Sequence, residues 1–132
     1  FYDGALNTVE QLKSDGHRVG ICTNKPEDLA VLLLTRLGVL DQFHSMIGAD
    51  TLAQRKPHAA PYIEAVRRAG GDVAKSCLIG DTKTDRDTAL AAGVPCVLVD
   101  FGLGDQNVHD LAADHIITDF EQLPAIVRTM AQ

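Results

Sequence analysis

The chain has 132 residues and a mass of 14.2 kDa, a size typical of one domain. Its 45% hydrophobic and 23% charged residues are those of an ordinary globular protein, which excludes extensive disorder. A formal charge of −6 without any basic run excludes binding along a nucleic-acid backbone or to an anionic membrane surface. A small phosphorylated ligand stays compatible with this charge, because a local pocket can be positive.

Helical periodicity recurs along the chain, each time followed by a short apolar run. Leu6, Val9 and Leu12 share one face of a first helix that Gly16 can end. Pro26 is placed to begin a second helix, which Gly38 closes. We expect two further helices at about 59–69 and 84–92, and a last one that carries Leu123, Ile126, Val127 and Met130.

The apolar runs between these helices predict strands at 18–23, 45–48, 77–80, 95–99 and 115–117. They are short and almost entirely apolar, as expected for strands that helices cover on both faces. Strands that alternate with helices indicate crossover connections and a parallel sheet. The sequence therefore predicts a single domain over 1–132, an α/β doubly wound parallel sheet in three layers.

Doubly wound domains bind ligands at the carboxyl ends of their strands, and the first strand ends in a polar run. Thr23 and Asn24 follow it directly and precede Lys25 and Pro26. A hydroxyl, an amide and a helix N-terminus at one place favour an anion site. The alternative is that Thr23 or Asn24 only caps the helix.

A second polar segment, Arg55-Lys56-Pro57-His58, precedes the third helix. Pro57 stiffens the loop that presents Lys56, whose charge could balance a phosphate and a nearby carboxylate. A solvated surface lysine is the alternative. We interpret His58 as a helix-start residue rather than a catalytic one.

The most specific feature is Gly80-Asp81-Thr82-Lys83-Thr84-Asp85, which places two carboxylates four residues apart after an apolar strand. If Asp85 lies on the first helical turn, it faces back toward Asp81. Mg²⁺ takes one or two such carboxylates and fills its other positions with water and substrate phosphate. The alternative is that Asp81 caps the helix and Asp85 complements its dipole.

Taken together, the order Thr-Asn, Arg-Lys-Pro and Gly-Asp-x-x-x-Asp resembles the haloacid dehalogenase-like phosphohydrolases, and within them the phosphoglycolate phosphatase group. The resemblance extends to the segments 16–27, 37–39 and 92–95 and covers essentially the whole chain. It implies a Mg²⁺-dependent hydrolysis of a small phosphomonoester, with 2-phosphoglycolate favoured, through an aspartyl-phosphate intermediate.

The resemblance also implies roles for individual residues. Thr23 would hydrogen-bond the transferring phosphoryl group with help from the amide of Asn24, and Lys56 would stabilise its oxygens and the nucleophile. Asp81 would bind Mg²⁺ directly. Asp85 would act on the metal through water or by orienting Lys56.

The family's nucleophile motif, a strand that ends in Asp-x-Asp-Gly, does not occur in this sequence. We interpret Asp3 as a turn residue, so the resemblance places the nucleophile and the helical cap outside this chain. The sheet would then lack its central strand, between the strand that ends at Thr23 and the one that ends at Gly80. Two half-sheets with open edges would result, and we expect the 132 residues not to fold stably alone.

One other function stays open, an inactive or partial domain that serves as a phosphate-binding or interaction module. A receiver-like domain would need an acidic pair at its start and a phosphorylatable Asp at the end of a central strand, and this sequence shows neither. No apolar run reaches the roughly 20 residues of a membrane span, and no signal peptide is evident, so we expect a cytoplasmic protein. Cys22, Cys77 and Cys96 are expected to be buried and reduced, and the oligomeric state cannot be read.

Overall fold

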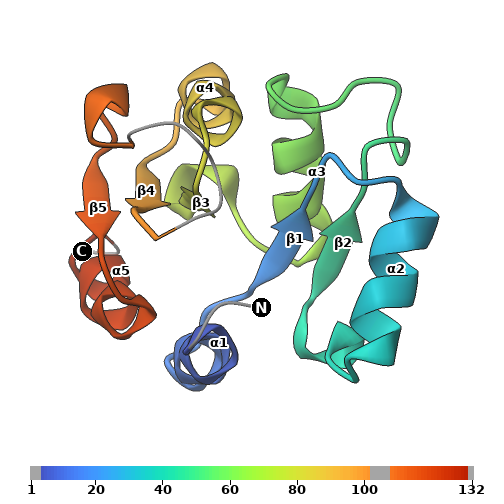
Figure 1. Ribbon diagram of the computed structural model, residues 1–132, viewed down its shortest axis with the longest axis horizontal. Coiled ribbons are helices and arrows are strands. Elements are labelled where there is room, and N and C mark those ends of the chain that lie inside the picture. The colour runs from blue at the N-terminus through green and yellow to red at the C-terminus, as the bar shows by residue number, and fades with distance from the viewer. Residues whose placement is uncertain (1–3, 102–107, 131–132) are drawn as a thin grey trace.

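A computed structural model describes residues 4–101 and 108–130, so Asp3 lies outside the described residues. Within these ranges, strands and helices alternate as the sequence predicts (Figure 1). In chain order, the elements are α1 (Ala5–Ser14), β1 (Gly20–Cys22), α2 (Glu27–Arg36), β2 (Ser45–Ile47), α3 (Ala59–Arg68), β3 (Leu78–Gly80), α4 (Lys83–Ala92), β4 (Cys96–Val99), β5 (His115–Ile117) and α5 (Leu123–Met130).

The order of the elements confirms the prediction, but several strands are shorter than the apolar runs that predicted them. At the start of β1, the amide of Val19 donates to Nδ1 of His44 over 3.0 Å, so a side chain replaces the backbone partner that a longer strand would need. Gly93 ends α4 with a φ of 71°, a left-handed conformation that glycine adopts without strain.

The strands form two separate parallel sheets. β1 pairs with β2, and β4 lies between β3 and β5. Among the described residues no strand lies between β1 and β3, so each half-sheet ends in an edge at this position (Figure 1). This split confirms the expectation of two half-sheets with open edges.

Helices cover both faces of the strands. α3 and α4 pack against each other, with α3 on β1 and β2 and α4 on β3 and β4, while α1 packs against α5 on the opposite side (Figure 1). β4 is buried along its whole length. Cys96 and Leu98 contribute to the core beneath α3 and α4, and Val97 and Val99 contribute to the core beneath α1 and α5. The three-layer α/β architecture is therefore confirmed.

None of the helices described combines the length and the apolar character that crossing a membrane requires.

Candidate functional site

The end of β1 is connected to the loop that carries Lys56. The side-chain amide of Asn24 donates a hydrogen bond to the carbonyl oxygen of Lys56 over 3.1 Å. Beside it, the hydroxyl of Thr23 accepts from the amide of Lys25 over 3.2 Å, and the amide of Thr23 donates to the carbonyl of Ile47. Two segments that are 32 residues apart therefore meet where β1 ends.

The N-terminus of α2, expected to attract an anion, already has a carboxylate partner. The amide of Glu27 donates to Oδ1 of Asp50 over 2.8 Å. Gly48 permits this approach, because a Cβ at position 48 would overlap the backbone of Glu27. The sequence analysis missed Asp50, since no local pattern relates it to a helix that begins 23 residues earlier.

Lys56 forms an ion pair with Asp85, and this pair joins the two half-sheets. Nζ of Lys56 lies 2.7 Å from Oδ1 of Asp85, and the two side chains are only 12% and 9% exposed. The peptide bond between Lys56 and Pro57 is cis. The alternative interpretation, a solvated surface lysine, is thus wrong, because the ammonium group is buried against a carboxylate.

The carboxylate of Asp85 is held from its other side as well. Its Oδ2 accepts hydrogen bonds from the amide of Asp81 over 3.0 Å and from the amide and hydroxyl of Thr82 over 3.3 and 3.1 Å. Gly80 leaves the necessary space, since a Cβ there would overlap the carboxylate. Burial by itself raises the pKa of Asp85, but the charge of Lys56 and these hydrogen bonds outweigh burial and hold the pKa below its usual value.

Thr82, which the sequence analysis did not single out, is the N-cap of α4. Its hydroxyl accepts from the amide of Asp85, and the side chain of Asp85 bonds back to the N-cap amide, which forms a capping box. The spacing Thr-x-x-Asp was a visible signal for this arrangement. Asp81 was expected to cap the helix in the alternative interpretation, and Thr82 does so instead.

Four of the five predicted site residues form one chain of contacts. Asn24 bonds to the backbone of Lys56, Lys56 pairs with Asp85, and Asp85 accepts from the backbone of Asp81. Thr23 is the neighbour of Asn24 at the end of β1. The carboxyl ends of β1 and β3 therefore lie at one rim.

The acidic residues at this rim offer an incomplete set of ligands for a divalent cation. The described residues contain no group of three or more His, Cys, Asp or Glu side chains that could hold a metal ion. Asp85 is committed to Lys56 and Thr82. Mg²⁺ usually takes one or two carboxylates, so Asp81 fits as one ligand, and the other ligands would come from water, phosphate or another segment.

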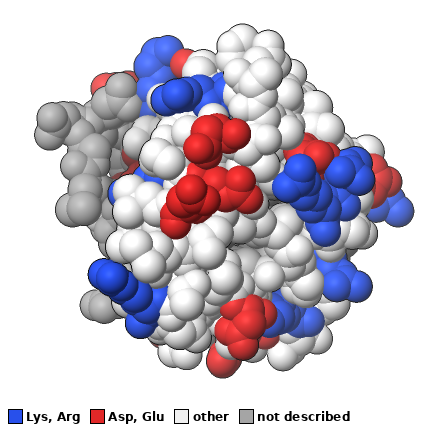
Figure 2. All heavy atoms as spheres, turned by 90° about the vertical axis from the view of Figure 1, so that its right-hand side faces the viewer, with Lys and Arg blue, Asp and Glu red and all other residues white. Residues whose placement is uncertain are grey.

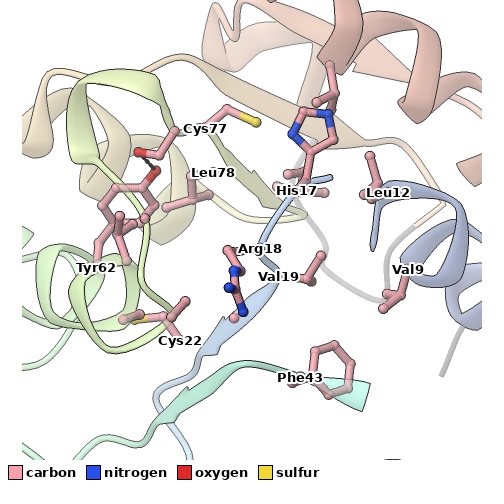
Figure 3. Close-up of a pocket in the computed structure, with 18 of the residues that line it drawn as sticks. Val9, Leu12, His17, Arg18, Val19, Cys22, Phe43, Tyr62, Cys77 and Leu78 are labelled. Atoms are coloured by element: carbon pink, nitrogen blue, oxygen red, sulfur yellow. Dashed lines mark hydrogen bonds between the residues drawn. The ribbon is translucent and has the colours of Figure 1, made fainter. Parts of the chain in front are cut away.

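A cavity of about 1050 Å³ extends from this rim between β1 and β3 (Figure 3). Lys56 and Asp85 line it together with Cys22 and Ile79 of the facing strand edges. Its walls are mainly apolar side chains of α1, α3 and α5, among them Leu12, Val66, Leu123 and Val127. His17 and Arg18 lie on the segment that leads into β1.

The facing edges of this cavity carry backbone groups that point into it. The amide of Thr23 points to β2 and the amide of Leu78 points to β4. Because successive residues of a strand point their backbone groups to opposite sides, the N–H groups of Cys22 and Ile79 point into the cavity. Ile79 is 37% exposed there, although a strand of this type is usually covered on both faces.

The cysteines are free thiols, but only Cys96 is buried; Cys22 and Cys77 are half-buried and line the cavity. The expectation that all three are buried is therefore wrong, because the open edge exposes the two that flank it. Burial still raises the pKa of Cys22 and raises those of Cys77 and Cys96 to about 11. All three thiols are protonated at neutral pH.

Known proteins resemble this chain in sequence and in structure. The family model of the haloacid dehalogenase-like hydrolases matches residues 1–99. A phosphoglycolate phosphatase of Mesorhizobium japonicum is 38% identical over 92% of this chain and 54% of its own length. A phosphoglycolate phosphatase of Rhodospirillum rubrum is 42% identical over 92% of the chain and 51% of its own length.

The crystal structure of a predicted phosphoglycolate phosphatase from Haemophilus somnus superposes with a TM-score of 0.87 at 28% identity, over 95% of this chain and 56% of that one. The chain thus spans about half the length of the curated relatives it matches. The family model covers the strands from β1 to β4 and all five predicted site residues.

Proposed function

The chain belongs to the haloacid dehalogenase-like hydrolases, and we propose that the protein containing it is a Mg²⁺-dependent phosphatase of the phosphoglycolate phosphatase type. The observation that carries this proposal is the buried Lys56–Asp85 pair at the rim where β1 and β3 end. The 38% and 42% identical phosphoglycolate phosphatases support it. A cytoplasmic location is part of the same proposal.

Lys56 binds and stabilises the phosphoryl oxygens. A cation in a site shielded from water interacts with developing negative charge more strongly than it would in solution. Asp85 fixes the direction of the ammonium group, and Thr82 and the amide of Asp81 fix Asp85 in turn. The position of Lys56 is thus set before substrate arrives.

Thr23 and Asn24 orient the phosphoryl group from the side of β1. The hydroxyl of Thr23 can donate its proton to a phosphoryl oxygen while its oxygen accepts from the amide of Lys25. Asn24 supplies its backbone amide, since its side chain is engaged with the carbonyl of Lys56.

Asp81 is the residue of this chain that we assign to Mg²⁺. The metal, when bound, neutralises phosphate charge. Asp85 contributes by orienting Lys56 rather than by acting on the metal through water, since its carboxylate already accepts hydrogen bonds on both oxygens. This choice separates the two roles that the family resemblance left open for Asp85.

We assign the nucleophilic aspartate to a strand that precedes residue 1 in the full-length protein and lies in the cavity between β1 and β3. The cavity's apolar walls suit a strand covered on both faces, and the N–H groups of Cys22 and Ile79 face it from either side. A parallel strand there ends at the rim, so a carboxylate that follows it reaches the surroundings of Lys56. Residues 1–132 are, by this proposal, the greater part of one core domain.

Hydrolysis of para-nitrophenyl phosphate tests the proposal. The 132-residue chain should show no turnover, whereas the N-terminally extended protein should hydrolyse the ester with Mg²⁺ and lose this activity with a chelator. In the extended protein, Lys56→Ala should lower kcat/KM by about 10²–10³-fold, the usual effect of removing one charge-stabilising group. Full activity of Lys56→Ala would contradict the proposal.

Lys83→Met is the matched control for Lys56→Ala. Lys83 also pairs with an aspartate over 2.7 Å, but it lies on the outside of α4 with 59% exposure, and its loss should leave kcat/KM unchanged.

Asp81→Asn should raise the Mg²⁺ concentration needed for half-maximal rate. An unchanged Mg²⁺ dependence would remove Asp81 from the site.

The substrate is tested by comparing kcat/KM for 2-phosphoglycolate with that for a sugar phosphate and for pyrophosphate. A preference for 2-phosphoglycolate supports the assignment, and a preference for the sugar phosphate or for pyrophosphate corrects it.

The alternative function, a phosphate-binding module without activity, predicts that the extended protein binds inorganic phosphate in calorimetry and yet hydrolyses none of these compounds.

A further inference from the structure

The outward face of α2 carries an exposed row of leucines, none of which lines the cavity. Leu29, Leu32 and Leu33 are between 40% and 45% exposed, although buried Ala30 and Leu34 hold the opposite face of the helix against the domain. Leu37, just after the helix, is 58% exposed. Contiguous apolar surface of this kind marks an interaction site more often than scattered single leucines do.

Charged residues flank this row in a particular order. Asp28, Leu32 and Arg36 follow one another at intervals of four residues, so they lie along one line of the helix surface. No hydrogen bond or ion pair engages the side chain of Asp28 or Arg36 within the described part of the chain. Figure 2 faces the side of the molecule that carries α2 and shows acidic groups near its centre amid largely uncharged surface.

This order is complementary to itself. In two antiparallel copies of α2 related by a twofold axis beside Leu32, Asp28 of one copy meets Arg36 of the other, since both lie four residues from Leu32. The symmetry creates this contact twice. Leu29 and Leu33 both lie to one side of the line through Asp28, Leu32 and Arg36. The twofold axis keeps them on that side in each copy, so they pack against Leu29 and Leu33 of the other copy.

We propose that the face of α2 formed by Asp28, Leu29, Leu32, Leu33 and Arg36 joins two copies of this protein in an antiparallel, twofold-symmetric dimer. One helix pair buries less than the about 800 Å² per partner of a standard interface, so the dimer should have a dissociation constant on the order of 10 µM. The interface includes none of the residues assigned to phosphate or Mg²⁺, and the dimer is independent of the proposed phosphatase activity.

Sedimentation equilibrium of the full-length protein tests this inference through charge reversal. Asp28→Arg and Arg36→Asp alone should each weaken dimerisation at least tenfold, because each places like charges opposite one another twice. The double variant Asp28→Arg/Arg36→Asp should restore the wild-type dissociation constant. Restoration of this kind requires that the two residues face each other across copies.

Leu90→Asp is the matched control, since Leu90 on α4 is 60% exposed and lies outside the proposed interface; it should leave the dimer unchanged. Thermal unfolding should confirm that every variant is folded. A wild-type protein that stays monomeric at about 100 µM, ten times the expected dissociation constant, overturns the inference. A dimer that survives both single reversals, or one that the double variant fails to restore, overturns it as well.

Discussion

The two half-sheets of this molecule are completed to different degrees. β4, in the middle of one half, is buried along its whole length and packs on helices of both layers. β1, in the other half, has one neighbouring strand among the residues that the structure describes, and its own residues are exposed or half-buried. A strand with two neighbouring strands is thus fully buried in the core, whereas a strand with one neighbour stays partly exposed, although strand and helix alternate in the same way in both halves.

The contrast teaches where the free energy of folding comes from in each half. Leu98 is completely buried because β3 and β5 flank it and α3 and α4 cover it. Ile79 of β3 has an equally apolar side chain but borders the cavity instead and is 37% exposed. Burial contributes about 25 cal/mol for each Å² of apolar surface removed from water, so the edges of the cavity forgo part of this contribution.

Thermal unfolding should show the largest consequence of this difference. The isolated 132-residue chain should give no cooperative, monomeric transition in circular dichroism, because the open edges and the apolar cavity leave β1 and β2 weakly attached to the rest. The N-terminally extended protein should unfold in one cooperative transition. A sharp, concentration-independent transition of the isolated chain would show that the cavity costs little stability.

Alanine substitutions in the extended protein sharpen the comparison. Leu98→Ala should lower the free energy of unfolding by about 3–5 kcal/mol, as for other fully buried leucines. Ile79→Ala should cost about 2–4 kcal/mol if a strand covers this side chain in the extended protein. Denaturant titration measures both values, and a cost below about 1 kcal/mol for Ile79→Ala would mean that its surroundings stay open.

Acid titration tests the bridge between the halves. The pKa of Asp85 is lower in the folded protein than its ordinary value of 3.8, so its contribution to stability is complete above that value. The contribution should disappear as the pH falls through the lower, folded pKa. The stability difference between the extended wild type and Asp85→Asn should therefore shrink below about pH 4. A difference that stays constant between pH 6 and pH 2 would contradict the assigned pKa direction.

Local patterns in the sequence predicted most of the fold. Apolar periodicity located the helices, and the almost entirely apolar run that contains β4 indicated a strand covered on both faces, as observed. The lengths of the strands were overestimated, because apolar character does not reveal that Nδ1 of His44 replaces a backbone partner of the Val19 amide.

The site was predictable as a set of residues but not as a network. The resemblance to a family located Asn24, Lys56, Asp81 and Asp85, and the structure brings them together. The contact of Asp50 with α2 depends on the tertiary fold and has no local signal. The pairing of Lys56 with Asp85 was anticipated only as one of two roles for Asp85, because the choice depends on which groups surround its carboxylate.

Hydrogen exchange at the two facing edges tests most directly whether a strand occupies the cavity. In the N-terminally extended protein, the amides of Cys22 and Ile79 should exchange as slowly as that of Leu78, whose carbonyl partner on Pro95 is already present. Such protection would show that the amides of both edges donate to a strand between them. Rapid exchange of both amides, beside a slowly exchanging Leu78, would contradict the account.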